Sequence, residues 1–195
     1  MIYLSDMLKE VTDANLLEHD LSRTIYVDLD GVLVDFDNGF KAIAGGLDKH
    51  EYAQKHGKRQ LWNLINSYGK AWWANLKWTA DGTKLWSVLQ SKNVKVLTSG
   101  STANTGTYAI EGKTEWVRNH LGPDVPLIIV SKSTDKQRYS RPGDILIDDL
   151  QSNILEWTVK GGIGILHTSA DDSINKLQDV INTQTETYGY SWSNV

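Results

Sequence analysis

The stretch IYVDLDGVLVDFD, residues 25–37, places four carboxylates within and directly after a segment that otherwise has the composition of a buried strand. Its first half is an almost continuous run of β-branched, aromatic and aliphatic residues, as expected for a strand covered on both faces. Asp28 and Asp30 stand where such a strand ends, and Gly31 follows them. Because crowded carboxylates repel one another, groups from elsewhere in the chain must offset this charge.

Similar apolar segments recur along the chain, and helical periodicity separates them. The predicted strands are residues 24–29, 94–97, 127–130, 145–147 and 163–166. Apolar residues at helical spacing predict helices over 81–90, near 150–157 and near 174–181. Alternating strands and helices predict an α/β fold, a Rossmann-like parallel sheet flanked by helices and joined by right-handed crossovers. Ligands of such sheets bind at the carboxyl ends of the strands, beside the point where strand order reverses.

Residues 38–80 interrupt the alternation, because they contain no convincing strand. They hold a Gly-Gly break at 45–46 and four of the eight tryptophans, which predicts a small helical insertion. The predicted organisation is a helical N-terminal extension (1–22), a core domain (23–37 and 81–182), the helical insertion (38–80) and a loose polar tail (183–195).

Composition excludes some classes of function. A net charge of -4 and an isoelectric point near 5.7 disfavour a surface that binds nucleic acid, which depends on clustered Lys and Arg. The chain has no cysteine, so it forms neither disulfides nor thiolate zinc sites, and any metal must be held by oxygen or imidazole. Without a signal-like start or a long apolar run, we expect a cytoplasmic protein with no membrane contact.

Polar side chains follow four of the predicted strands. In order along the chain they are Asp28 and Asp30, Thr98 and Ser99, Lys132 and Lys136, and Asp148 and Asp149. Each set alone has an ordinary explanation in turn or helix-cap chemistry. Together, three or more carboxylates at one sheet edge indicate a hard divalent cation, and all-oxygen ligation suits Mg²⁺. The lysine and hydroxyls would then bind a dianionic group, for which phosphate fits best.

These segments resemble the four motifs of the haloacid dehalogenase (HAD) superfamily, in order and on the expected elements. The matching segments are Asp28-Leu-Asp-Gly-Val, Val-Leu-Thr98-Ser-Gly, Lys136 and Ile-Asp148-Asp149, and the resemblance covers about residues 24–181. It implies the HAD-like fold, a phosphatase that works through an aspartyl-phosphate, and a Mg²⁺ cofactor. A carboxylate at position 30 favours phosphoryl chemistry, because the dehalogenase branch lacks one there.

The resemblance also implies a role for each matching residue. Asp28 corresponds to the nucleophile and a metal ligand, and Asp30 to the general acid and base, whose backbone carbonyl also binds the metal. Thr98 and Ser99 are expected to hold the phosphoryl oxygens. Lys136 is the preferred motif lysine over its rivals Lys132 and Lys113, and Lys113 is a candidate secondary phosphate contact. Asp149 is expected to bind the metal and Asp148 to orient the lysine, although the two could be exchanged.

The insertion lies where the superfamily places one type of cap, which excludes water and contacts the leaving group. Trp72 and Trp73 are candidates to stack on a flat leaving group such as a nucleobase, the alternative being that the tryptophans form the insertion's own small core. The short cap, the Thr-Ser-Gly segment, the Lys113-Thr-Glu-Trp-Val-Arg segment and the Ile-Asp-Asp ending are similar to the 5'(3')-deoxyribonucleotidases. The turn at residues 141–144 departs from that pattern.

The leading interpretation is a Mg²⁺-dependent phosphomonoesterase acting on a small phosphorylated substrate, a (deoxy)nucleoside monophosphate. The alternatives are a phosphatase for sugar phosphates or nucleic-acid ends, a phosphotransferase, and a binding module without turnover. The sequence leaves the oligomeric state open. Asp35 is expected in the turn that leads to the insertion and Asp37 at the start of the next helix, neither of them in the site.

Overall fold

The computed structural model describes residues 23–100 and 102–189. Its centre is a parallel five-stranded sheet with the order β3-β2-β1-β4-β5. The strands are β1 (Ile25–Val27), β2 (Val94–Ser99), β3 (Leu127–Val130), β4 (Ile145–Asp148) and β5 (Ile163–Leu166). The predicted parallel α/β fold is therefore confirmed. Strand order runs outward from β1 to β3 and then returns to β4, so the reversal falls between β1 and β4.

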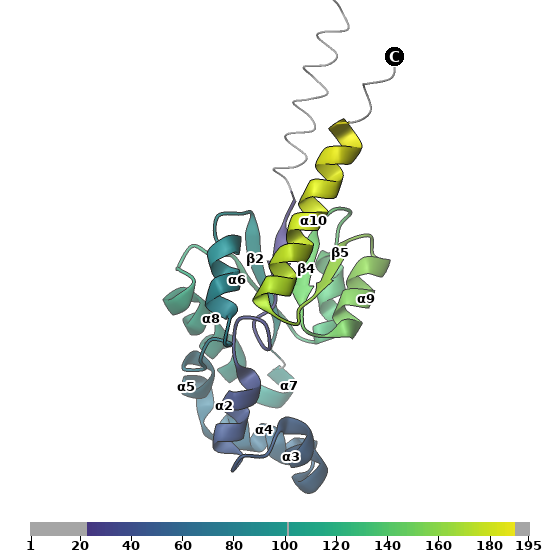
Figure 1. Cartoon of the computed structure of the whole chain (residues 1–195). Helices are drawn as coiled ribbons and strands as arrows, with labels where there is room; N and C mark the ends of the chain where they lie inside the picture. Colours follow the sequence, from purple (N-terminus) through teal and green to yellow (C-terminus); the bar gives the residue numbers. More distant parts are fainter. Residues whose placement is uncertain (1–22, 101, 190–195) are drawn as a thin grey trace, which may run out of the picture.

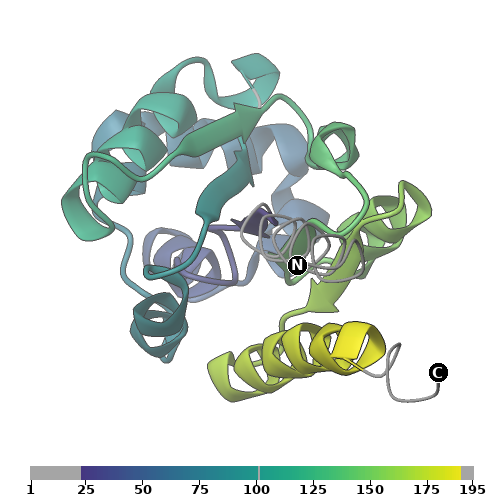
Figure 2. The same cartoon turned by 90° about the horizontal axis from the view of Figure 1, so that it is seen from above.

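Helices cover both faces of the sheet because the strands are apolar on both sides. Alternate residues of β1 show this: Tyr26 packs edge-on against Trp157, with ring centroids 5.1 Å apart, whereas Ile25 and Val27 belong to the core on the other face. The first face is covered by α9 (Gln151–Val159). Helices α6 (Gly82–Leu89), α8 (Tyr108–His120) and α10 (Ala170–Gly189) contribute to the other core (Figure 2).

The predicted insertion is helical. It consists of α2 (Phe36–Ile43), α3 (Lys49–His56), α4 (Lys58–Ser67) and α5 (Gly69–Ala74), which gather at the end of the sheet where the strands finish (Figure 1). Asp35, expected in a turn, is instead the N-cap of α2 and accepts a hydrogen bond from the Asn38 N–H (3.1 Å), so Asp37 lies one residue inside the helix. Phe40, Leu61 and Ile65 are buried and give the insertion an apolar interior.

Helix α5 joins the insertion to the core domain by packing closely on α8. A Cβ at Gly112 of α8 would collide with the Trp73 Cβ and the Lys70 carbonyl, so glycine permits the two helices to approach. Lys70 also pairs with Glu115 (2.9 Å), and Trp116 Nε1 donates to the Leu76 carbonyl (2.8 Å). The insertion is thus attached to the helix that carries Lys113.

The remaining elements are α7 (Thr102–Thr105) and the 3₁₀ helix η1 (Ser133–Tyr139). Helix α10 continues to Gly189, so residues 183–189, expected in a loose tail, are helical, and α10 extends away from the insertion (Figure 1). The rest of that tail (190–195) and the expected N-terminal helix (1–22) lie outside the described residues. Within the described part of the chain, no helix is both long and apolar enough to cross a membrane.

Candidate active site

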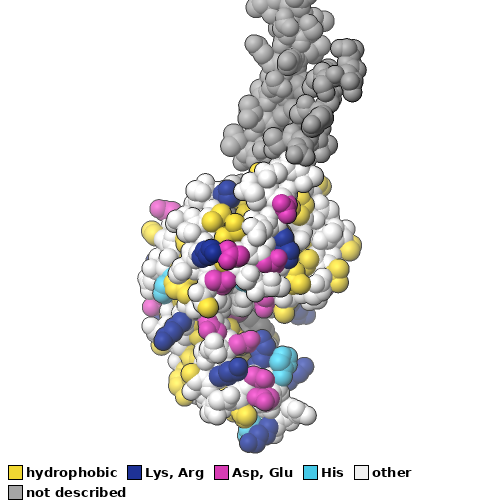
Figure 3. All heavy atoms as spheres, in the orientation of Figure 1, with side chains coloured by type: hydrophobic (Ala, Val, Ile, Leu, Met, Phe, Trp, Pro, Cys, Tyr) yellow, Lys and Arg dark blue, Asp and Glu magenta, His cyan; other side chains and the backbone are white. Residues whose placement is uncertain are grey.

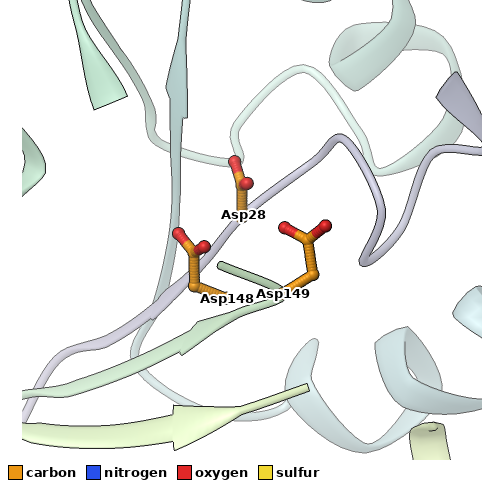
Figure 4. Close-up of side chains that lie close together, drawn as sticks. All are labelled: Asp28, Asp148 and Asp149. Carbon is orange, nitrogen blue, oxygen red and sulfur yellow. The ribbon is translucent and has the colours of Figure 1, made fainter. Parts of the chain in front are cut away.

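Three carboxylates meet at the reversal of strand order, at the carboxyl ends of β1 and β4. Asp28 directly follows β1, and its N–H donates to the Ile147 carbonyl of β4 (3.0 Å). Asp148 is the last residue of β4 and Asp149 the next. One oxygen from each of the three lies within 4.8 Å of the others, and their carboxylates face a common space (Figure 4). The structure thus brings together these three carboxylates from the ends of β1 and β4.

Lys136 of η1 joins two of these carboxylates. Its ammonium lies 2.8 Å from Asp28 Oδ1 and 2.6 Å from Asp148 Oδ2, and its side chain is almost wholly buried. Burial alone lowers the pKa of Lys136, but the negative charges of Asp28 and Asp148 outweigh burial and raise it. Lys136 is therefore a cation at neutral pH. Of the three lysines considered from the sequence, Lys136 is the one in contact with Asp28.

Asp148 is fully buried and both of its oxygens have partners. Besides Lys136, its carboxylate accepts from the Leu150 N–H (2.9 Å) and from Asn153 Nδ2 (2.9 and 3.0 Å). Ser133 in turn donates to Asn153 Oδ1 (2.7 Å). Asp148 therefore fixes the position of Lys136 and the start of α9. Sequence reasoning missed Asn153, although its position one helical turn after Asp149 could have drawn attention to it.

Asp149 differs from Asp148 because no described residue makes a hydrogen bond or ion pair with its carboxylate. Burial and the charges of Asp28 and Asp148 raise the pKa of Asp149 to about 7. Gly31 has φ +81°, and a Cβ at that position would collide with the Asp149 carboxylate. The backbone of the Asp28–Gly31 turn thus leaves room for the Asp149 carboxylate, whose ionised form is disfavoured by burial and by its acidic neighbours.

Lys113 of α8 organises the other side of the site. Its buried ammonium lies 2.7 Å from Asp30 Oδ2, 3.0 Å from Thr98 Oγ1 and 2.7 Å from the Ser99 carbonyl. Burial raises the pKa of Asp30, and the charge of Asp28 adds to this effect, while Lys113 lowers it; the net shift is upward. Asp30 Oδ1 is buried without a hydrogen-bond partner among the described residues. Asp30 is therefore poised to hold a proton.

A cavity of about 740 Å³ opens between these residues and the helical insertion. Asp28, Asp30, Lys136 and Asp149 line it. The two hydroxyls expected at a phosphoryl group are placed differently, because Ser99 lines the cavity whereas Thr98 is buried behind it against Lys113. Such a volume is in the range of ordinary small-molecule sites.

The two tryptophans named from the sequence, Trp72 and Trp73, line different cavities. Trp73 borders the cavity, and its ring centroid lies 5.2 Å from the Lys113 ammonium. Trp72 contacts Phe36 (5.4 Å between centroids) and lines a different, smaller cavity. Trp62 of α4 lines the main cavity instead. The insertion thus offers Trp62 to a ligand, while Trp73 is a buried residue at the cavity wall and Trp72 belongs to the packing of the insertion.

The charges in the site do not balance. Four carboxylates, those of Asp28, Asp30, Asp148 and Asp149, have two lysines, Lys113 and Lys136, in direct contact, which leaves two negative charges. A divalent cation among Asp28, Asp148 and Asp149 would offset them, and an all-oxygen ligand set suits a hard cation. This count takes all four acids as ionised; a proton on Asp30 would leave one negative charge. The arrangement can therefore hold such a cation beside the Asp28 carboxylate, a possible nucleophile, and the Asp30 carboxyl, a possible proton donor.

Solved structures resemble the chain, whereas comparisons of its sequence find no match. No protein-family model and no curated protein matches the chain. A haloacid dehalogenase-like family hydrolase from Streptococcus pneumoniae matches over 78% of this chain and 90% of its own, with 18% identity and a TM-score of 0.50. At this identity the likeness establishes the fold, which is that of the haloacid dehalogenase-like hydrolases.

Two further solved structures resemble the chain more loosely. A HAD family enzyme from Bacteroides thetaiotaomicron, solved as an Asp-to-Ala mutant in complex with magnesium and inorganic phosphate, matches over 75% of this chain and 94% of its own (15% identity, TM-score 0.43). A hydrolase from Streptococcus pneumoniae TIGR4 matches over 82% and 98% (13% identity, TM-score 0.43).

Proposed function

We propose that the protein is a Mg²⁺-dependent phosphomonoesterase that works through a phosphorylated Asp28. The observation that carries this proposal is the pairing of two carboxylates with two buried lysines at one strand end. Lys136 holds Asp28 (2.8 Å) and Lys113 holds Asp30 (2.7 Å), so the two acids are kept apart in different surroundings. Separate environments for neighbouring acids are typical of a site that needs one ionised carboxylate and one protonated carboxyl.

In the proposed reaction, an Asp28 carboxylate oxygen attacks phosphorus and forms a bond to it. The bond from phosphorus to the leaving oxygen breaks, and the Asp30 carboxyl gives that oxygen its proton. A water molecule then attacks the phosphoryl group on Asp28, Asp30 takes up the proton from the water, and Asp28 is released with inorganic phosphate. Lys136 remains charged throughout and offsets the negative charge near Asp28, which its raised pKa favours.

The carboxylates of Asp28 and Asp149 fit Mg²⁺, with the Asp30 backbone carbonyl as an expected third ligand. Asp148 is also near enough, but its oxygens already accept from Lys136, Asn153 and the Leu150 N–H, so we assign it to positioning. When bound, Mg²⁺ supplies positive charge to the phosphoryl oxygens and lowers repulsion between that group and Asp28.

For the substrate we propose a small organic phosphate, a (deoxy)nucleoside monophosphate. The support is a cavity much larger than a phosphate group, bordered by the half-buried Trp62, which offers a flat apolar surface to a base. A sugar phosphate, a nucleic-acid end or transfer to an alcohol acceptor remain alternatives. On charge balance we propose no role in nucleic-acid binding, and we propose a cytoplasmic location.

Phosphate release from a panel of nucleotides and sugar phosphates, with and without Mg²⁺, tests the proposal. We expect release that needs Mg²⁺ and disappears in Asp28→Asn, whereas Asp124→Asn, at an exposed carboxylate that does not line the cavity, behaves as the parent. Full activity in the Asp28→Asn variant would rule out the mechanism. A binding module without turnover would release no phosphate from any member of the panel.

A further inference from the structure

Basic side chains line the part of the cavity that the proposed reaction does not use. Lys49, His50 and Lys58 come from α3 and α4 of the insertion, and Lys132 comes from the loop after β3. Among the described residues, the acids that line the cavity are Asp28, Asp30 and Asp149, and all three belong to the reaction site. The cavity is therefore acidic at the strand ends and basic elsewhere.

Two of these cations have no partner that neutralises them. Lys49 pairs with Asp37 (3.0 Å) and lies 5.7 Å from the Phe36 ring centroid, so it is engaged. The ammonium groups of Lys58 and Lys132 make no ion pair or hydrogen bond within the described residues, and both side chains are exposed. Neither lysine contacts Asp28, Asp30 or Asp149. They are thus available to a ligand.

Lys58 is the first residue of α4 and lies at the junction with α3, because Gly57 is both the C-cap of α3 and the N-cap of α4. The partial negative charge at the end of α3 offsets the partial positive charge at the start of α4, so the Lys58 ammonium supplies the positive charge at this rim of the cavity. Trp62 follows on α4 and lines the same cavity.

Apolar side chains lie among these basic groups in the cavity lining. Phe36, Leu61, Trp62 and Trp73 all line the space, and the volume of about 740 Å³ exceeds what a phosphate group alone requires. A ligand that fills it needs an apolar or flat body in addition to the phosphate. If that body carried no charge, Lys58 and Lys132 would have no counterpart.

We propose that the preferred substrate is a phosphomonoester whose leaving group carries a second anionic group, a phosphate or a carboxylate, bound by Lys58 with Lys132. This inference rests on the proposed phosphatase function and narrows the small organic phosphates to those with a charged leaving group, so that a nucleoside bisphosphate is preferred to the monophosphate. The second anion does not react; it orients the leaving group relative to Asp30. Recognition by two exposed lysines acts mainly on substrate binding and depends on salt concentration.

Matched substrate pairs test this inference. The first pair is phenyl phosphate and 4-carboxyphenyl phosphate; the second is a nucleoside 5'-monophosphate and its 3',5'-bisphosphate, so the two pairs distinguish carboxylate from phosphate. We expect a higher kcat/KM for the member with the second anion, and we expect this difference to arise mainly from a lower KM. In Lys58→Gln this preference falls about two- to fivefold, as expected for one exposed charge pair. Lys132→Gln lowers it as well.

Lys55→Gln is the control, because Lys55 is an exposed lysine of α3 that does not line the cavity. We expect it to keep the parent's preference. Added salt should reduce the preference in the parent and have little effect on it in Lys58→Gln. Direct binding of 4-hydroxybenzoate, compared with that of phenol by calorimetry, measures leaving-group binding without turnover, and we expect 4-hydroxybenzoate to bind more weakly to Lys58→Gln.

The outcomes separate the two proposals. Hydrolysis that depends on Asp28 but shows no preference for the second anion, or a preference that Lys58→Gln and Lys132→Gln leave intact, would overturn this inference while the phosphatase proposal stands. If no phosphomonoester is hydrolysed, the phosphatase proposal fails. The 4-hydroxybenzoate and phenol comparison then still decides whether the two lysines bind an anion, and equal binding of both compounds would overturn that as well.

Discussion

Lys113 and Asp30 show how one buried contact can affect both chemistry and stability. Lys113→Met would leave Asp30 beside the Asp28 charge without its cation, and breaking a buried ion pair in this way costs about 3 kcal/mol of unfolding free energy. Because Asp30 can then take up a proton, the deficit should shrink as pH falls. Urea unfolding at several pH values measures both effects.

Lys70→Met is the matched control, because Lys70 of α5 makes an exposed ion pair with Glu115 of α8. We expect its unfolding midpoint to stay near that of the parent. A midpoint for Lys113→Met equal to that of Lys70→Met would show that the buried contact contributes nothing to stability.

Asp149 makes cation binding depend on pH. Its pKa of about 7 means that, without metal, a proton occupies this carboxyl increasingly as pH falls below that value. A cation requires the ionised form, so Mg²⁺ affinity should decrease between pH 8 and pH 6 and binding should release protons. Calorimetry in buffers of different ionisation enthalpy measures this release. In Asp149→Asn we expect the Mg²⁺ affinity to fall and most of its pH dependence to disappear. A Mg²⁺ affinity of the parent that stays constant from pH 8 to pH 6 would contradict this role of Asp149.

At the scale of elements, the contact between α5 and α8 holds the insertion over the site. Gly112→Ala places a methyl group against Trp73 and Lys70, and overpacking of this kind costs about 1–3 kcal/mol, more than the gain in helix propensity. We expect a lower thermal midpoint and a weakened Trp73–Lys113 contact. Asn119→Ala, at an exposed position of α8, serves as control. A stabilised Gly112→Ala variant would mean that the helices separate easily.

A buried histidine between β5 and α10, His167, makes stability fall as pH falls. His167 Nδ1 lies 2.8 Å from Ser173 Oγ, and burial lowers the pKa of His167 despite the opposing charges of Asp81 and Asp172. The unfolded chain binds a proton near pH 6.5 while the folded chain resists it, so stability is lost as pH drops below about 6.5. The slope cannot exceed about 1.4 kcal/mol per pH unit for one group.

Comparing unfolding free energies of the parent and His167→Gln from pH 7.5 to 5 isolates this contribution from the carboxylates, which the two proteins share. We expect the difference between them to narrow as pH falls. Parallel pH profiles would show that His167 does not take part in this dependence.

At the scale of the whole molecule, the sequence was sufficient for the sheet and for the meeting of Asp28 with Asp148 and Asp149. Continuous apolar runs are a local signal, and parallel strands bring their carboxyl ends to one edge whatever lies between them. The preference for Lys136 agrees with the geometry for the same reason, because η1 directly follows β3.

The features that the sequence did not predict depend on how helices are oriented against the sheet. Lys113 contacts Asp30 from α8, which packs against α5, and Trp62 rather than Trp72 lines the cavity because of how the short helices α4 and α5 are rotated against the core domain. Residues 183–189 have a polar composition without an apolar stripe, yet they continue a helix that begins at Ala170.

On the surface of the insertion, side chains of both charges lie close together, without a patch of one sign on the face shown in Figure 3.

The proposed enzyme combines a rigid sheet edge with an insertion that supplies the outer wall of the cavity. The proposed reaction requires that Asp28 becomes phosphorylated. The direct test is mass spectrometry of acid-quenched protein mixed with Mg²⁺ and a hydrolysed phosphomonoester, using Asp30→Asn to slow the second step. We predict one phosphoryl group on the peptide that contains Asp28, and none in Asp28→Asn. Phosphate release with no phosphorylated peptide at any time, or undiminished release by Asp28→Asn, would contradict the account.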